Sequence, residues 1–362
     1  MRILLVRLRL LGDVVFTTPV IRGVRRRFPD AHIAYLVEEP AAPVVRGNPH
    51  LDEVIVARRP QGAARMLEDL RLGLRLRRRG FDLVLDLHGG PRASWITWLS
   101  GARERVGYAV AGRSWMYTRV VDRPRELRAR HSVENQWDLL AALGAGPPDP
   151  VRDPLEMVED PAAAARVEQR LRALGVHPGA PLVVLHVSAG NPFRRWPAVH
   201  FAQLAAGIIA ADPARAVVLT AGPSDRRAAE DIGEQARGLL PDGLRERILR
   251  AGEFDLPELR ALIGRAALFI GGDSGPLHVA GTTRAPIVGL FGPTLAARSA
   301  PWRDPAIPAR AVEPGPLPCR PCDQRVCAPG DFRCLTTIAP GQVLAAVESV
   351  LAPNAARAAG CE

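Results

Sequence analysis

The chain has 362 residues, of which 47% are hydrophobic and 24% are charged. This length exceeds the size at which one hydrophobic core keeps growing, so two domains are expected, and the composition is that of a soluble globular protein. No apolar stretch reaches the roughly 20 residues that span a bilayer. Because the first residues follow a strand pattern and not that of a secretion signal, we expect a cytoplasmic protein.

The basic residues are unevenly distributed along the chain. All 48 are arginines, and residues 1–130 hold 25 of them against 13 acidic residues, whereas the remainder holds 23 against 25. This surplus predicts an anionic partner, which is a phosphorylated substrate, a membrane surface or a nucleic acid. A nucleic acid is not expected, because the arginine cluster at 75–79 contains no aromatic residue. A solvated helix face is the alternative for that cluster.

The first half alternates short apolar runs with helical patterns, which predicts a parallel sheet with right-handed crossovers. Helices are predicted at about 17–28 and 62–79, and strands at Ile3–Val6, His32–Val37, Val54–Val56 and Leu83–Leu87. A proline-rich stretch at 144–156, GAGPPDPVRDPLE, then predicts a linker.

The α/β pattern restarts after this stretch with a helix at 166–176, and a last helix is predicted at about 340–352. Strands are predicted at Leu182–Val187, Ala216–Thr220, Arg247–Arg250, Ala267–Ile270 and Pro286–Phe291. We therefore expect an α/β protein with two Rossmann-like domains, 1–155 and 156–362, facing across a cleft. Neither half has the G-x-G-x-x-G turn of a nicotinamide-dependent oxidoreductase, which argues against that class.

The segment RLRLLGDVVFTTPVIRGVRRRF at 7–28 places Asp13 in the turn after the first strand. A carboxylate at a helix N-terminus suits the helix dipole but would repel a phosphate bound there. The first domain is therefore not expected to bind phosphate at this turn. Asp13 is either a helix cap or a group that receives a proton.

Three strand ends in the second half carry residues suited to a nucleotide. The segment LFIGGDSGPLHVAGTTRAPIVGLFGPT at 268–294 offers Asp273, Ser274, Gly275 and His278 at the start of a helix, where free N–H groups favour phosphate. The alternative for this segment is a plain glycine turn, with Asp273 as a helix cap and His278 packed locally.

The other two strand ends strengthen the nucleotide interpretation. LHVSAGNPFRRWP at 185–197 supplies Ser188, Arg194 and Arg195, and a guanidinium can hold a phosphate with two hydrogen bonds. VLTAGPSDRRAAE at 218–230 supplies Asp225, whose carboxylate can accept hydrogen bonds from a ribose diol. A nucleotide site in the second domain is therefore predicted.

Three segments together resemble glycosyltransferase family 9, the ADP-heptose:lipopolysaccharide heptosyltransferases: ILLVRLRLLGDVVFTTPVIRGVRRRFPDAHIAYLV, FRRWP and DSGPLHVAGTTRAPIVGLFGPT. The resemblance implies a GT-B fold, an ADP-sugar donor on the C-terminal domain, a phosphorylated glycolipid acceptor on the N-terminal domain, and inversion without a catalytic metal or other cofactor. It implies transfer of L-glycero-D-manno-heptose to a Kdo or heptose hydroxyl of the lipopolysaccharide inner core. The resemblance also implies that the enzyme acts at the cytoplasmic face of the inner membrane, where the arginines of residues 1–130 would contact the anionic lipid surface. A same-fold transferase acting on a protein or another surface glycan is the alternative.

The resemblance also assigns roles to residues. Asp13 is the expected general base, and the donor residues are Ser188, Arg194, Arg195, Asp225, Asp273, Ser274, Gly275 and His278. Many relatives have lysine where this chain has Arg195. The segment DLHGGPRAS at 86–94 resembles an acceptor-side motif in which His88 replaces the usual glutamine. The expected acceptor residues are Gly12, Arg58, Arg59, His88, Arg92 and Arg113.

Four of the five cysteines lie close together in sequence, at Cys319, Cys322, Cys327 and Cys334. Such clustering in a cytoplasmic chain favours a metal over disulfides, and four thiolates suit zinc or iron. The segment 319–334 is therefore a candidate structural metal site, with packed reduced thiols as the alternative.

Overall fold

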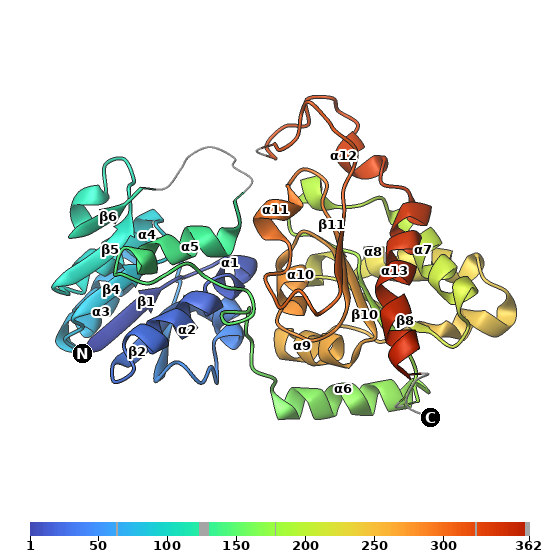
Figure 1. The fold of residues 1–362 in the computed structure, drawn as a ribbon, viewed down its shortest axis with the longest axis horizontal. Helices are drawn as coiled ribbons and strands as arrows, with labels where there is room; N and C mark the ends of the chain where they lie inside the picture. The colour runs from blue at the N-terminus through green and yellow to red at the C-terminus, as the bar shows by residue number, and fades with distance from the viewer. Residues whose placement is uncertain (63, 123–129, 178, 323, 359–362) are drawn as a thin grey trace. The chain divides into compact units, whose positions relative to one another are not determined.

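The structure is a computed structural model that describes residues 1–62, 64–122, 130–177, 179–322 and 324–358. The chain divides into two compact units, Met1–Val158 and Glu159–Glu362. Each unit contains one six-stranded sheet in which all neighbouring strands are parallel, with helices joining them (Figure 1). Both units are therefore Rossmann-like, as the alternating pattern predicts. Within the described ranges, no helix combines the length and apolarity needed to cross a membrane.

The sheet of unit 1 has the strand order β3-β2-β1-β4-β5-β6. Its strands are β1 (Arg2–Val6), β2 (His32–Glu38), β3 (Glu53–Ala57), β4 (Leu83–Asp86), β5 (Glu104–Tyr108) and β6 (Arg119–Val121). Its helices are α1 (Leu11–Val15), α2 (Thr18–Arg27), α3 (Ala64–Arg78), α4 (Pro91–Leu99) and α5 (Ser132–Ala141), with short 3-10 turns η1 (Glu39–Val44) and η2 (Ser114–Met116). Because β1 lies between β2 and β4, the order reverses beside the carboxyl end of β1, where ligands bind in such sheets.

Two helices of unit 1, α3 and α4, cover the same face of its sheet. Leu72 and Leu76 of α3 join Ala93 and Ile96 of α4 in one buried cluster with residues of the strands. The two helices approach closely at Gly73, where an added Cβ would lie 2.4 Å from the Cβ of Leu99. The absence of a side chain at this position therefore sets the spacing of the two helices.

The sheet of unit 2 has the strand order β12-β11-β10-β7-β8-β9. Its strands are β7 (Leu182–His186), β8 (Ala216–Thr220), β9 (Ile248–Leu249), β10 (Leu268–Gly272), β11 (Ile287–Leu290) and β12 (Ala309–Val312). Its helices are α6 (Pro161–Ala173), α7 (Ala198–Ala211), α8 (Arg226–Gly238), α9 (Leu256–Arg265), α10 (Gly275–Ala280), α11 (Ala296–Ser299), α12 (Arg333–Thr336) and α13 (Pro340–Ala358), with 3-10 turns η3 (Pro192–Arg194), η4 (Pro223–Asp225) and η5 (Asp242–Arg247). The carboxyl ends of β7, β8 and β10 meet at one edge of this sheet.

The helix predicted at about 17–28 is confirmed as α2, but a separate short helix, α1, precedes it and was not predicted. Thr17 Oγ1 donates to the Val14 carbonyl (2.7 Å) and Thr18 Oγ1 donates to the Val15 carbonyl (2.8 Å). These hydroxyls satisfy carbonyls at the end of α1 before α2 starts. The break keeps α1 as a separate short helix directly after β1, and Asp13 lies in its first turn.

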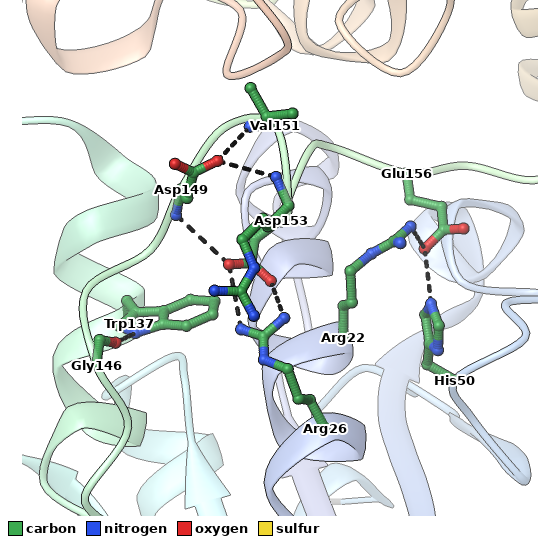
Figure 2. A network of polar contacts seen from close by, with 10 residues as sticks. Arg22, Arg26, His50, Trp137, Gly146, Asp149, Val151, Asp153 and Glu156 are labelled. Carbon is green, nitrogen blue, oxygen red and sulfur yellow. Dashed lines mark hydrogen bonds and ion pairs between the residues drawn. The ribbon is translucent and has the colours of Figure 1, made fainter.

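The stretch predicted to be a linker packs onto unit 1 instead (Figure 2). Residues 146–158, which we call the strap, are fixed to α2 at two places. Asp153 accepts two hydrogen bonds from Arg26 (2.7 and 3.2 Å), and Glu156 pairs with Arg22 (3.1 Å) and lies 3.8 Å from the His50 ring. Because the strap is held by unit 1, the division between the units falls at 158/159, after the expected 155/156 boundary.

Candidate functional site

The carboxyl end of β1 places Asp13 beside Arg7. The cap residue of α1 is Leu10, so Asp13 is not the helix cap. Its carboxylate forms an ion pair with the Arg7 guanidinium, which is 7% exposed, while the Asp13 side chain is 38% exposed. Arg7 also donates to the Leu87 carbonyl (2.8 Å). A buried arginine thus orients a carboxylate that solvent and ligands can still reach.

The loop after β4 lies against the same strand end. Asp86 is fully buried and accepts hydrogen bonds from the N–H groups of His88 and Gly89 (2.9 Å each) and from the Tyr117 hydroxyl (2.6 Å). Burial raises the pKa of Asp86. The Leu8 N–H points to His88 Nδ1 at 3.4 Å, so the loop is pinned beside the end of β1, and His88 lies there with it.

The predicted acceptor arginines have different surroundings. Arg113 donates to the Gly89 carbonyl (3.2 Å) and therefore belongs to the loop after β4. Arg92 is buried, and its guanidinium binds Asp69 (2.8 Å), Glu38 and the Arg58 carbonyl (2.6 Å). Each of the three guanidinium nitrogens of Arg92 is thus engaged, and the bond to the Arg58 carbonyl fixes the backbone there. Gly12 lies in α1, next to Asp13, and Arg59 lies 3.6 Å from Glu38.

In unit 2, a buried chain of hydrogen bonds joins the ends of β7 and β8. His186 Nδ1 lies 3.0 Å from Thr220 Oγ1, and His186 Nε2 lies 3.3 Å from Ser188 Oγ. Ser188 Oγ accepts from the Gly222 N–H (2.9 Å). Burial lowers the pKa of His186 to about 4, so the ring is neutral near pH 7. This chain of contacts fixes the backbone of the turn that follows β8.

Two of the predicted donor residues pair with each other across the loops after β7 and β8. Arg195 NH2 lies 3.1 Å from Asp225 Oδ1, and Arg195 Nε donates to the Ala189 carbonyl (2.9 Å). The pairing places the guanidinium expected to bind phosphate next to the carboxylate expected to bind ribose. Both side chains keep some exposure, so each can still contact a ligand.

The third strand end centres on Asp273, which is buried. It accepts from Thr294 Oγ1 (2.7 Å), and Arg194 NH1 reaches both its carbonyl (2.9 Å) and its carboxylate (3.2 Å). His278 Nε2 lies 3.5 Å from its other carboxylate oxygen. The cap residue of α10 is Ser274, whose hydroxyl has no hydrogen-bond partner among the described residues. Asp273 is therefore not a helix cap; it connects β10, β11 and the loop after β7.

A cavity of about 530 Å³ lies at the β8 and β9 side of the sheet of unit 2. Its walls come from Thr220 and Ala221 at the end of β8, from α8, and from residues 249–254 after β9. Thr220 is also the hydrogen-bond partner of His186. The cavity therefore borders the end of β8 and has the size expected for a small ligand.

The four clustered cysteines are free thiols and are half-buried. Burial, together with the neighbouring thiols, raises the pKa of Cys334 to about 11. Among the residues with described positions, no group of three or more His, Cys, Asp or Glu side chains is arranged to hold a metal ion. The structure thus gives no support to the zinc or iron site predicted for this segment.

Several site residues were not predicted. Arg7 was missed because its partner Asp13 lies across a strand-to-helix turn, and Gln324 was missed because it lies far along the chain from Arg194, whose Nε donates to it (2.6 Å). His186 and Thr294 each lie at or just past a strand end, which was the only signal in the sequence for either of them.

The comparisons with known proteins agree with this architecture. Residues 70–329 match the family described as glycosyltransferase family 9 (heptosyltransferase). Lipopolysaccharide heptosyltransferase 3 of Escherichia coli is 30% identical over 353 residues, covering 95% of this chain and 97% of that protein. The solved glycosyl transferase family 9 structure from Veillonella parvula has a TM-score of 0.82 at 23% identity and covers 97% of each chain. The Escherichia coli ADP-heptose lps heptosyltransferase II has a TM-score of 0.75 at 21% identity, covering 98% of this chain and 99% of that one.

Proposed function

Because this chain belongs to glycosyltransferase family 9 and is a glycosyltransferase with the GT-B fold, we propose that it transfers L-glycero-D-manno-heptose from ADP-heptose. The acceptor is a Kdo or heptose hydroxyl of the lipopolysaccharide inner core. Unit 1 binds this acceptor and unit 2 binds the donor. The observation that carries the proposal is the pairing of Arg195 with Asp225 at the strand ends of unit 2, since a diphosphate and a ribose need these two groups side by side.

The donor is bound by its phosphates, its ribose and its base. Arg194 and Arg195 hold the diphosphate through charge-assisted hydrogen bonds, together with Ser188 and with Ser274 and Gly275 at the start of α10. Asp225 accepts from the ribose hydroxyls, and the adenine occupies the 530 Å³ cavity. His278 and Asp273 keep the loop around the diphosphate in place through their mutual contact and the bond from Thr294.

Asp13 is the general base of the reaction. Its carboxylate takes the proton from the acceptor hydroxyl, whose oxygen then attacks the anomeric carbon of the heptose. As this bond forms, the bond from that carbon to the β-phosphate oxygen breaks, ADP leaves, and the configuration inverts. Negative charge grows on the leaving phosphate, where the two guanidinium groups stabilise it. Arg7 keeps Asp13 oriented during this step.

The acceptor side and its location follow from the same proposal. Gly12, His88, Arg58 and Arg113 lie at the carboxyl edge of the sheet of unit 1, where they contact the phosphorylated sugars. Arg92 contributes by fixing Arg58. The enzyme works at the cytoplasmic face of the inner membrane, in peripheral contact with anionic lipid.

The proposal is tested by measuring ADP release from ADP-L-glycero-β-D-manno-heptose with Kdo-lipid A or a heptosyl-Kdo-lipid acceptor. Asp13→Asn should lower kcat by about 10²- to 10⁴-fold, the typical contribution of a general base, with the donor KM little changed. Asp30→Asn is the matched control, because Asp30 is an exposed acid of the same unit. If the donor binds but neither lipid supports turnover, the proposed acceptor is wrong. A protein or another glycan would then be tested as the acceptor.

The donor side is tested separately. Arg195→Gln should weaken ADP binding by about tenfold to a hundredfold, because a charge-assisted hydrogen bond is worth about 1.5–3 kcal/mol. Arg227→Gln removes an exposed arginine of α8 and serves as the control. Equal ADP affinity in both variants, measured by titration calorimetry, would contradict the assignment of Arg195.

A further inference from the structure

Large apolar side chains are exposed together on one surface of unit 1. Of the sixteen exposed large apolar residues in the described part of the chain, seven lie on α3, α4 and η2, and all three of the exposed tryptophans are among them. They are Met66, Leu67, Leu70, Leu74, Trp95, Trp98 and Trp115, which we call the outer face. Single exposed apolar residues need no explanation, but a cluster of this size marks an interaction surface.

The outer face is separate from the core. α3 turns Leu72 and Leu76 toward the sheet, and α4 turns Ala93 and Ile96 the same way. The exposed residues lie on the opposite sides of these helices, which pack together at Gly73. Trp98 contacts the other two indoles: it stacks on Trp95 at 5.1 Å between ring centroids and meets Trp115 edge to face at 5.6 Å. The tryptophans thus form one exposed aromatic cluster.

The charge on this surface is positive. Arg71, Arg77 and Arg78 are exposed on α3 and make no ion pair with any described residue, while Arg75 pairs with Glu68 (2.9 Å). The other acid of α3, Asp69, is buried against Arg92. A helix that alternates exposed leucines with unpaired arginines has the composition of one that lies on a membrane surface.

A basic hollow lies along α3, the helix that also carries four residues of the outer face. It has a volume of about 580 Å³ and lies between β3 and α3. It is lined by Leu72 and Leu76 and by four arginines, Arg58, Arg75, Arg78 and Arg79, of which Arg75 pairs with Glu68 and Arg79 pairs with Glu53. Arg75 and Arg78 belong to α3, so the hollow and the outer face share one helix. Arg58 and Arg78 make no ion pair with any residue that the structure describes, and phosphate groups are the ligands that guanidiniums bind best.

We propose that the outer face docks on an anionic lipid bilayer. The indoles and leucines enter the boundary between headgroups and acyl chains, where tryptophan is enriched, and the arginines bind the lipid phosphates. A second copy of the chain fits less well, because a symmetric contact would bring the unpaired arginines of both copies together. The inference rests on the proposed function in that a lipid-anchored acceptor must be reached at a membrane.

The test is flotation of the full chain with vesicles of phosphatidylcholine alone or with about one third phosphatidylglycerol added. We expect binding to the anionic vesicles only. Removing three arginines, in R71Q/R77Q/R78Q, should weaken it about 100-fold at low salt, since each contributes about fivefold. The control R227Q/R247Q/R310Q removes the same charge from exposed positions of unit 2 and should bind as the wild type does.

The apolar contribution is tested with W98S/W115S, against the control V199S/L239S, which alters exposed apolar residues elsewhere. The tryptophan variant should lose vesicle binding while its circular dichroism and its ADP affinity stay unchanged. Transfer to a deacylated, water-soluble acceptor should also persist, which separates a failure of docking from a failure of the proposed function. Unchanged vesicle binding in both test variants would overturn the proposal. So would a concentration-dependent dimer that W98S/W115S abolishes in a chain that never binds vesicles.

Discussion

Acidification should weaken unit 2 through His186. The ring is neutral in the folded chain because burial lowers its pKa from 6.5 to about 4. Between these two values the unfolded chain binds a proton that the folded chain does not, so stability is fully present above pH 6.5 and falls as the pH falls toward 4. Each pKa unit corresponds to about 1.4 kcal/mol, so the loss is about 2 kcal/mol from pH 7 to pH 5 and about 3 kcal/mol at pH 4.

The hydrogen bonds around His186 connect this loss to the donor site. The neutral ring satisfies both neighbours in either tautomer, with one nitrogen donating to a hydroxyl oxygen and the other accepting from a hydroxyl hydrogen of Thr220 or Ser188. The doubly protonated ring can only donate, so both hydroxyls must turn their hydrogens away from it, and Ser188 does so at the oxygen that also accepts from the Gly222 N–H. ADP affinity should therefore fall together with stability as the pH is lowered to 5.

The assay is urea unfolding of the full chain at pH 7 and pH 5, with ADP titrations at both. His186→Gln is the matched variant, because an amide can donate and accept here but does not titrate. It should lose about 2 kcal/mol less than the wild type over this interval. His177→Gln, at an exposed histidine, should follow the wild type. Equal losses in the wild type and in His186→Gln would refute the reasoning.

Two further predictions concern packing in unit 1. Asp153→Asn should destabilise the chain by about 1–3 kcal/mol in urea unfolding, because it leaves Arg26 without its charged partner; a loss near zero would mean that the strap is held by its other contacts. Gly73→Ala should cost about 1–3 kcal/mol through overlap with Leu99, whereas Gly238→Ala, which has open space around its position, should be neutral or slightly stabilising.

The parts of the fold that were predicted from sequence are those in which apolar residues run without interruption. β1, β4 and β10 are buried on both sides, and such strands read as continuous apolar runs. β5, β6 and β12 were missed because they begin with Glu104, Arg119 and Ala309-Arg310, and the last two strands lie at sheet edges, where charged side chains are tolerated. The pattern therefore predicted the centre of each sheet better than its rim.

The site residues likewise include some whose position was predictable from sequence and some whose position was not. Ser188, Asp225 and Asp273 follow strand ends, so parallel topology alone placed them at one edge of unit 2. The ion pair of Arg7 with Asp13 and the burial of Arg92 depend on the path of the chain through three dimensions. The spacing of residues in the sequence does not reveal such contacts. For Arg92, the residue type alone suggested a contact with ligand, but its buried acidic partners already bind its guanidinium.

The strap determines which segments of the chain must be exchanged together. Its Gly146 carbonyl accepts from the Trp137 indole (2.6 Å), and its acidic residues hold α2 (Figure 2). In a chimera joined inside the proline-rich stretch, Trp137 and α2 would come from one parent and their hydrogen-bond and ion-pair partners in the strap from the other. A junction at 158/159 keeps that set intact. Chimeras between relatives should therefore fold when they are joined just before α6 and be destabilised when they are joined a dozen residues earlier. The proline-rich composition of the earlier stretch would have suggested the opposite choice.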